Sequence, residues 1–173
     1  AGSLATISAA GPAQACTIYY PQDLEDLRSA DVVVLGRITN YEIVARRDPR
    51  PEDRTHFWGS GHARFDLVVD EVLAGRAGTR LSVAWINSTF AMPRAMSSGQ
   101  YLIALVDPGF RPVPLRGPGN IILSAPEKGL LIPLQAHCSE AFMFESMSEE
   151  ALAVRRILDQ GRSREASPGR DSR

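Results

Sequence analysis

The side chains of this sequence that could ligate a metal ion are few and widely spaced. The imidazole and thiol groups belong to three histidines and two cysteines: His56, His62, His137, Cys16 and Cys138. A structural zinc site needs four such ligands, usually in closely spaced pairs. His56 and His62 lie in a predicted loop and lack the i, i+4 spacing of two ligands on one helix face. We therefore expect no metal site and no cofactor.

Nucleophilic catalysis has no recognisable motif here either. The sequence contains no G-x-S-x-G elbow, and Ser97-Ser98-Gly99 is typical of a turn. No serine or cysteine stands in a convincing order with a histidine and an aspartate. The sequence therefore predicts a protein without catalytic residues, not an enzyme.

The first fifteen residues resemble the end of an export signal. Residues 1–15 are small, uncharged and mildly apolar, and they close with Ala13-Gln14-Ala15 directly before Cys16. An A-x-A pattern of this kind is cut by signal peptidase. We expect residues 1–15 to be a signal remnant or a disordered leader and the protein to be secreted or periplasmic. An N-terminal lipid anchor on Cys16 is the alternative, although Ala13 stands where a lipobox normally has a large aliphatic residue.

Export makes a disulfide between Cys16 and Cys138 reasonable. An oxidising compartment lets such a bond persist. The bond would close a loop of about 120 residues, which the chain-entropy account values at about 4–5 kcal/mol. Two unpaired thiols are the alternative, and a lipid on the sulfur of Cys16 would forbid the bond.

Composition describes one domain with a real core. The chain has 173 residues, of which 44% are hydrophobic, and its formal net charge is −1. No apolar run approaches the roughly 20 residues that span a bilayer. A net charge so close to zero argues against a nucleic-acid partner, which usually demands a basic excess.

Periodicity predicts a mostly β domain between two helices. Apolar alternation or continuous apolar runs predict strands at Val32–Val44, Ala63–Leu73, Leu81–Trp85 and Gln100–Val106, and short strands at Asn120–Ser124 and Gly129–Leu134. Residues 45–62 and 107–119 are rich in Pro, Gly and charge, which is typical of long loops.

Helix signals flank these strands. Pro21–Ala30 is a short helix candidate, and Ser148–Gln160 is the clearest helix, with Ser146 and Glu149 as a capping box and Gly161 as its stop. Residues 161–173 form a polar tail that we expect to be disordered. We expect a small closed OB-type β-barrel of about five to six strands, with a short N-terminal and a longer C-terminal helix.

Several short motifs, in order, resemble the netrin-like or tissue-inhibitor-of-metalloproteinases-like (TIMP-like) OB-fold domain in its bacterial form. They cover about residues 16–160. The first is a cysteine after the cleavage site (Ala15-Cys16-Thr17), and an A-D-x-V-x-x-G strand (Ala30–Ile38) and an F-x-V-x-x-V-type strand (Phe65–Gly75) follow it. A G-x-Y-L-I strand (Ser98–Ile103) and a late Cys-Ser before a helix (Cys138-Ser139) come after them.

The resemblance implies a protein partner, with a metalloprotease as one option. In the animal inhibitors the freed amine and carbonyl of the first cysteine chelate the catalytic zinc, and the next residue enters the specificity pocket; these positions match Cys16 and Thr17 here. The sequence departs from the family at Ile18, where many relatives have a second cysteine, and it cannot form their further disulfides. A general protein-interaction module is therefore the main expectation, and an inhibitor that uses the Cys16 amine is the alternative.

The predicted loop Arg46–His62 is the preferred contact surface for a protein partner. It holds Phe57 and Trp58 among arginines, a composition typical of interface hot spots. The alternative is that both rings fold back and cover one end of the barrel.

Overall fold

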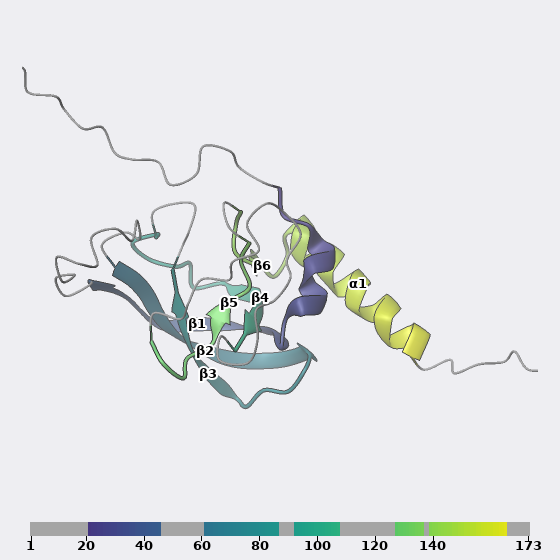
Figure 1. The fold of residues 1–173 in the computed structure, drawn as a ribbon, viewed down its shortest axis with the longest axis horizontal. Helices are drawn as coiled ribbons and strands as arrows, with labels where there is room; N and C mark the ends of the chain where they lie inside the picture. Colours follow the sequence, from purple (N-terminus) through teal and green to yellow (C-terminus); the bar gives the residue numbers. More distant parts are fainter. Residues whose placement is uncertain (1–20, 46–60, 87–91, 108–126, 137–138, 166–173) are drawn as a thin grey trace, which may run out of the picture.

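The computed structural model describes residues 21–45, 61–86, 92–107, 127–136 and 139–165 (Figure 1). Its elements, in chain order, are η1 (Leu24–Ser29), β1 (Val32–Ala45), β2 (Gly61–Ala74), β3 (Arg80–Trp85), β4 (Gln100–Val106), β5 (Ile132–Pro133), β6 (Met143–Glu145) and α1 (Glu149–Glu165).

The strands form one curled antiparallel sheet with a helix at the end of the chain. The order is β3-β2-β1-β4-β5, and β6 pairs with β4. The two ends of this order approach each other, because Val83 of β3 forms a parallel bridge with Leu131, the residue before β5. The backbone N–H of Ala84 donates to the carbonyl of Leu131 at 3.0 Å. The expected mostly β class and the C-terminal helix are confirmed.

The sheet separates two hydrophobic cores, and alternation along the strands assigns residues to one or the other. The helix-side core joins η1 and α1 to β1, β2, β4 and β6, and contains Leu27, Val33, Leu102 and Val154. The opposite-face core lies within the curl of the sheet and contains Val34, Phe65, Val83 and Ile103. Strand β4 is buried on both faces, which explains its unbroken apolar run from Tyr101 to Val106.

Helix α1 differs from the prediction at both ends. The Oγ of Ser148 accepts a hydrogen bond from the N–H of Ala151 at 3.2 Å, so Ser148 is the N-cap and the predicted Ser146–Glu149 capping box was wrong. The helix also continues past Gly161 to Glu165. A glycine inside a helix costs only about 1 kcal/mol relative to alanine, so it need not end the helix.

The stretch predicted as an N-terminal helix forms only a short 3₁₀ helix, η1. It begins after Asp23, whose carboxylate accepts from the N–H of Glu25 at 3.0 Å. Leu27 anchors it in the helix-side core. At six residues it is shorter than the predicted Pro21–Ala30.

The predicted strands at the centre of the sheet are confirmed, but the residues at which several of them begin or end differ from the prediction. The loop predicted over residues 45–62 was wrong at its margins, because Ala45, Gly61 and His62 extend the β1–β2 pairing. Strand β5 is only Ile132–Pro133 within the predicted Gly129–Leu134, and the strand at Asn120–Ser124 lies outside the described residues. Strand β6 was not predicted from the sequence.

Besides a register shift at Val33/Val34, two irregularities interrupt the pairing of strand β1 with β2. Pairing with β2 shifts register at Leu35/Gly36 and between Thr39 and Glu42. At the first, a Cβ on Gly36 would collide with the carbonyl oxygen of Val68, so only glycine allows this close approach. At the second, Asn40 has φ 54°, a left-handed conformation that asparagine tolerates better than most residues. The second bend shapes the site described next.

Candidate functional site

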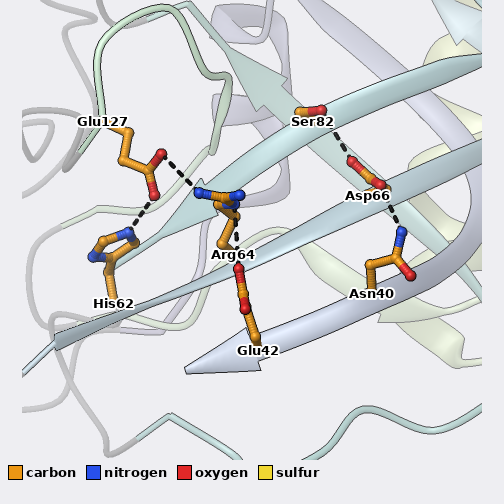
Figure 2. Close-up of polar contacts among 7 residues, drawn as sticks. All are labelled: Asn40, Glu42, His62, Arg64, Asp66, Ser82 and Glu127. Carbon is orange, nitrogen blue, oxygen red and sulfur yellow. Dashed lines mark hydrogen bonds and ion pairs between the residues drawn. The ribbon is translucent and has the colours of Figure 1, made fainter. Parts of the chain in front are cut away.

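An open cleft of about 580 Å³ lies over strands β1, β2 and β3. Its lining residues come from β1, β2, β3 and the turn before β5: Asn40, Tyr41, Glu42, Arg64, Phe65, Asp66, Ser82, Glu127 and Leu130. The volume falls within the roughly 300–1,000 Å³ of small-molecule sites. Figure 2 shows its polar side chains above the strands, with Glu127 reaching in from the turn. This cleft is therefore a candidate binding site.

Alternation along β2 and β3 explains why polar side chains gather there. Phe65 and Val83 point into the opposite-face core, so Arg64, Asp66 and Ser82 point the other way. The cross-strand register then brings them together, since Asp66 pairs with Ser82. On the other side of β2, Glu42 pairs with Arg64 after the bend at Asn40. β-Bulges often re-aim side chains next to functional sites.

Asp66 is the polar centre of the cleft. Its carboxylate accepts hydrogen bonds from Asn40 Nδ2 at 2.8 Å and from Ser82 Oγ at 3.0 Å, and it lies 3.4 Å from Arg80 Nη1. The bonds from Asn40 and Ser82, with the charge of Arg80, hold the pKa of Asp66 below its ordinary value. Asp66 is therefore an ionised hydrogen-bond acceptor that is held by partners from two strands, β1 and β3.

Glu127 ties the turn before β5 to strand β2. Its Oε1 lies 2.8 Å from His62 Nε2, and its Oε2 lies 3.4 Å from Arg64 Nη1. The hydrogen bond with His62, followed by the charge of Arg64, lowers the pKa of Glu127. Arg64 also reaches Glu42, with Nε to Oε1 at 3.4 Å. One wall of the cleft is thus held by a chain of ion pairs.

The apolar residues that line the cleft are Tyr41, Leu130 and Phe65, and the last of these is buried in the opposite-face core. The rings of Tyr41 and Phe65 stack with centroids 6.2 Å apart. Tyr41 donates its hydroxyl to the carbonyl of Pro93 at 2.7 Å, and partial burial raises the pKa of this tyrosine. The phenol is therefore a neutral, oriented surface beside the ionic groups.

The arrangement suits binding better than the catalytic chemistries considered from the sequence. Ser82 donates to Asp66, whereas His62 bonds to Glu127, so the hydroxyl and the imidazole belong to separate networks. Among the described residues no group of three or more His, Cys, Asp or Glu side chains could hold a metal ion. What the cleft offers is a fixed array of hydrogen-bonding groups.

The residues predicted from the sequence to meet a partner cannot be compared with this site. Cys16, Thr17, Phe57, Trp58 and Cys138 all lie outside the described residues. His62, which was predicted to lie in a loop, is instead a strand residue whose side chain is only 13% exposed. That interpretation was wrong because the β1–β2 pairing extends further than the apolar pattern does.

Sequence reasoning missed Asn40, Asp66, Ser82 and Glu127. A signal existed for two of them: Asp66 and Ser82 are polar positions of predicted alternating strands, so they had to share the solvent face. No local pattern announces Asn40 or Glu127. The position of Asn40 in the cleft depends on a bulge in β1. The position of Glu127 depends on a turn that brings it to His62 of β2, 65 residues away in the sequence.

No family model matches the sequence, and no curated protein is significantly similar to it. Among the described residues, no helix has the length and apolar character needed to cross a membrane.

Proposed function

We propose that this chain is an exported, non-catalytic protein-interaction module with an OB-type barrel of the netrin-like or TIMP-like kind. The observation that supports it most is the position of the cleft over β2 and β3. OB-folds bind their ligands on this face, between the loops that follow the first and fourth strands. The cleft therefore lies where such a module would carry its binding site.

The ends of two long connecting segments meet at this cleft. Ala45 and Gly61, which flank residues 46–60, are paired in register next to the cleft residues of β1 and β2. Glu127, which follows residues 108–126, contacts His62 and Arg64. Binding surfaces are commonly built from long loops on a rigid sheet. We propose that Phe57 and Trp58, in the first of these segments, contribute to the same surface.

A closed barrel is the form we propose for the sheet. The strand order β3-β2-β1-β4-β5 becomes an OB-type barrel once its two end strands pair. The parallel bridge between Val83 and Leu131 supports this closure, because it joins those two ends. A closed barrel also leaves fewer unpaired edges than an open sheet.

A blocking variant tests the proposed surface. Ser82→Trp places a large ring in the cleft on an exposed β-strand position, and Arg156→Trp places the same ring on the exposed surface of α1. We expect the immobilised protein to retain a partner from the exported proteins of its source cell. Ser82→Trp and Trp58→Ala should weaken this retention, whereas Arg156→Trp should not, with melting temperatures close to that of the parent. Equal retention by all variants would refute the proposed surface.

A metalloprotease inhibitor that uses the Cys16 amine is the second candidate. It needs the start of the domain to be held near Cys138. Gln22 Nε2 donates to the carbonyl of Glu140 at 3.1 Å, which joins a residue shortly after Cys16 to one shortly after Cys138. This contact favours the proposed disulfide and keeps the inhibitor in consideration.

A further inference from the structure

We propose that His62 and Glu127 form an acid-sensitive latch, which holds the turn at residues 127–131 against β2 and so keeps this turn joined to β3. The inference goes beyond the proposed function, because it concerns how the sheet closes and does not depend on what the cleft binds. Three observations carry it: the connection between the turn and β3 is narrow, one side-chain contact fastens the turn, and that contact depends on an ionised carboxylate.

The connection between β3 and the turn before β5 is narrow. Within the described residues, one backbone hydrogen bond accompanies the parallel bridge of Val83 with Leu131, and it runs from the N–H of Ala84 to the carbonyl of Leu131 at 3.0 Å. Ile132, the next residue, is buried and pairs with Val106 of β4. The chain is thus anchored from Ile132 onward, whereas the position of Leu131 at β3 also depends on the turn that precedes it.

The side chain of Glu127 fastens this turn to the sheet. Its Oε1 lies 2.8 Å from Nε2 of His62, as Figure 2 shows. Lys128 and Gly129 are exposed, and a Cβ on Gly129 would meet nothing within 4 Å. In the described part of the chain, no other side chain of residues 127–130 makes a hydrogen bond or an ion pair. Opening the contact of Glu127 would therefore release the turn.

The contact is strongest while Glu127 is ionised. An ionised carboxylate can only accept, so Nε2 of His62 donates this bond. The bond, followed by the charge of Arg64, lowers the pKa of Glu127. Its contribution is therefore present above the ordinary pKa of a glutamate, about 4, and is lost as the pH falls through the lower folded value. Acid should open the latch.

The remaining charged groups in and beside the cleft do not replace this contact. Arg64 lies 3.4 Å from both Glu42 and Glu127 and is half exposed, so its attraction is shared and screened. His62, by contrast, is 13% exposed. The others belong to β2, β3 and the turn itself, where Asp66 pairs with Arg80 and the side chain of Lys128 is exposed. His62 thus gives Glu127 its shortest and most shielded contact.

Opening the latch would change the cleft as well as the closure of the sheet. Glu127 and Leu130 both line the cleft, and both lie in the turn that the latch holds. Their displacement would remove one wall. The cleft should therefore keep its shape at neutral pH and lose this wall in acid.

Amide hydrogen exchange of the full chain, measured by NMR and corrected for the intrinsic effect of pH, tests the inference. The N–H of Ala84 is the probe, because it is buried and donates to Leu131. The N–H of Ala104 is the reference, because it is equally buried and donates to Phe142 at 3.0 Å, within the sheet and away from the turn. We expect the protection of Ala84 relative to Ala104 to fall by about tenfold between pH 6 and pH 3, the effect of weakening one hydrogen bond to a charged group.

Three variants identify the partners. Glu127→Gln removes the charge and His62→Ala removes the donor, so each should lower the relative protection of Ala84 already at pH 6 and leave it nearly independent of pH. Glu42→Gln is the matched control, since it removes the other carboxylate beside Arg64 and leaves the latch in place. It should behave as the parent does.

Three results would overturn the inference. The relative protection of Ala84 could be the same at both pH values in the parent, which would mean that nothing opens in acid. Glu42→Gln could lower it as much as Glu127→Gln does, which would assign the effect to Arg64. Ala84 and Ala104 could lose protection together, which would replace a local latch by global unfolding. None of these measurements involves a partner protein, so each outcome leaves the proposed function to its own test.

Discussion

At the scale of single residues, Asp66 is the point where the contacts of the cleft converge. Its two oxygens join β1 through Asn40 and β3 through Ser82 and Arg80. On the same face Asp70 accepts from Gln100 at 2.9 Å and from Arg37 at 2.9 Å, and these contacts lower the pKa of Asp70. Asp66 and Asp70 thus stabilise the sheet more when they are ionised than when they are protonated.

We expect stability to fall in acid, and Asp66 to contribute to that fall. Because the folded-state pKa of Asp66 is lowered, its contribution is present above the unfolded value of about 4 and is lost as pH falls through the lower folded value. The neutral variant Asp66→Asn cannot make this contribution at any pH. Urea midpoints measured between pH 6 and pH 3 should therefore decline less steeply for Asp66→Asn than for the parent. Parallel curves would contradict this assignment.

At the scale of elements, two glycines illustrate why the same residue type has opposite roles. Gly36 lies in β1 where the backbone of β2 comes too close for any side chain. Gly161 lies inside α1, where a Cβ would meet nothing within 4 Å. The first glycine is required by packing, and the second only weakens its helix.

The two Gly→Ala variants should therefore change stability in opposite directions. Gly36→Ala should destabilise by about 1–3 kcal/mol, since strand β1 or β2 must shift to admit the methyl group. Gly161→Ala should stabilise by up to about 1 kcal/mol through helix propensity. Chemical denaturation of both variants beside the parent measures the two signs. A neutral Gly36→Ala would mean that β1 is not held against β2 as described.

The predictability of the elements follows from how local their causes are. Gln100–Val106 was predicted with its observed bounds, because a strand buried on both faces has an unbroken apolar run. The cap of α1 was misplaced by two residues, since Ser146 and Ser148 both fit the local pattern and only the fold selects Ser148. Strand β6 is three residues long and depends on pairing with β4, which no local signal encodes.

The candidate site was less predictable than the strands that carry it. Alternation placed Asp66 and Ser82 on the solvent face of β2 and β3, but not beside Asn40, which depends on the bend of β1. Glu127 reaches the cleft through a contact between residues far apart in sequence. The hydrophobic pattern specifies which face a residue occupies, whereas the neighbours across that face depend on register and on turns.

At the scale of the whole molecule, the proposed disulfide would connect the start of the domain to its end. Export would provide the oxidising compartment in which this bond persists. Gln22 and Glu140 already join those regions by a hydrogen bond. The disulfide would add a covalent link near the same place. A free amine at Cys16 would indicate the inhibitor, and a lipidated Cys16 would indicate the anchored protein. An internal Cys16 would indicate the uncleaved chain.

Peptide mapping under non-reducing conditions should recover Cys16 joined to Cys138. Reduction should then lower the free energy of unfolding by about 4–5 kcal/mol, because the unfolded chain regains the freedom of a long loop. N-terminal sequencing and mass spectrometry of the exported protein complete the test. A free Cys16 amine supports the inhibitor and calls for a protease assay, whereas two alkylatable thiols would refute the disulfide.

The most direct test of the central claim uses Lys128, the single lysine of the chain. It is exposed in the turn between Glu127 and Leu130, which both line the cleft. Amine-reactive cross-linking in intact cells should therefore join a partner protein to Lys128 if the partner occupies the cleft. Moving the lysine to α1 with Lys128→Arg and Arg156→Lys should abolish that cross-link. A partner that cross-links to the relocated lysine and not to Lys128 would contradict the account.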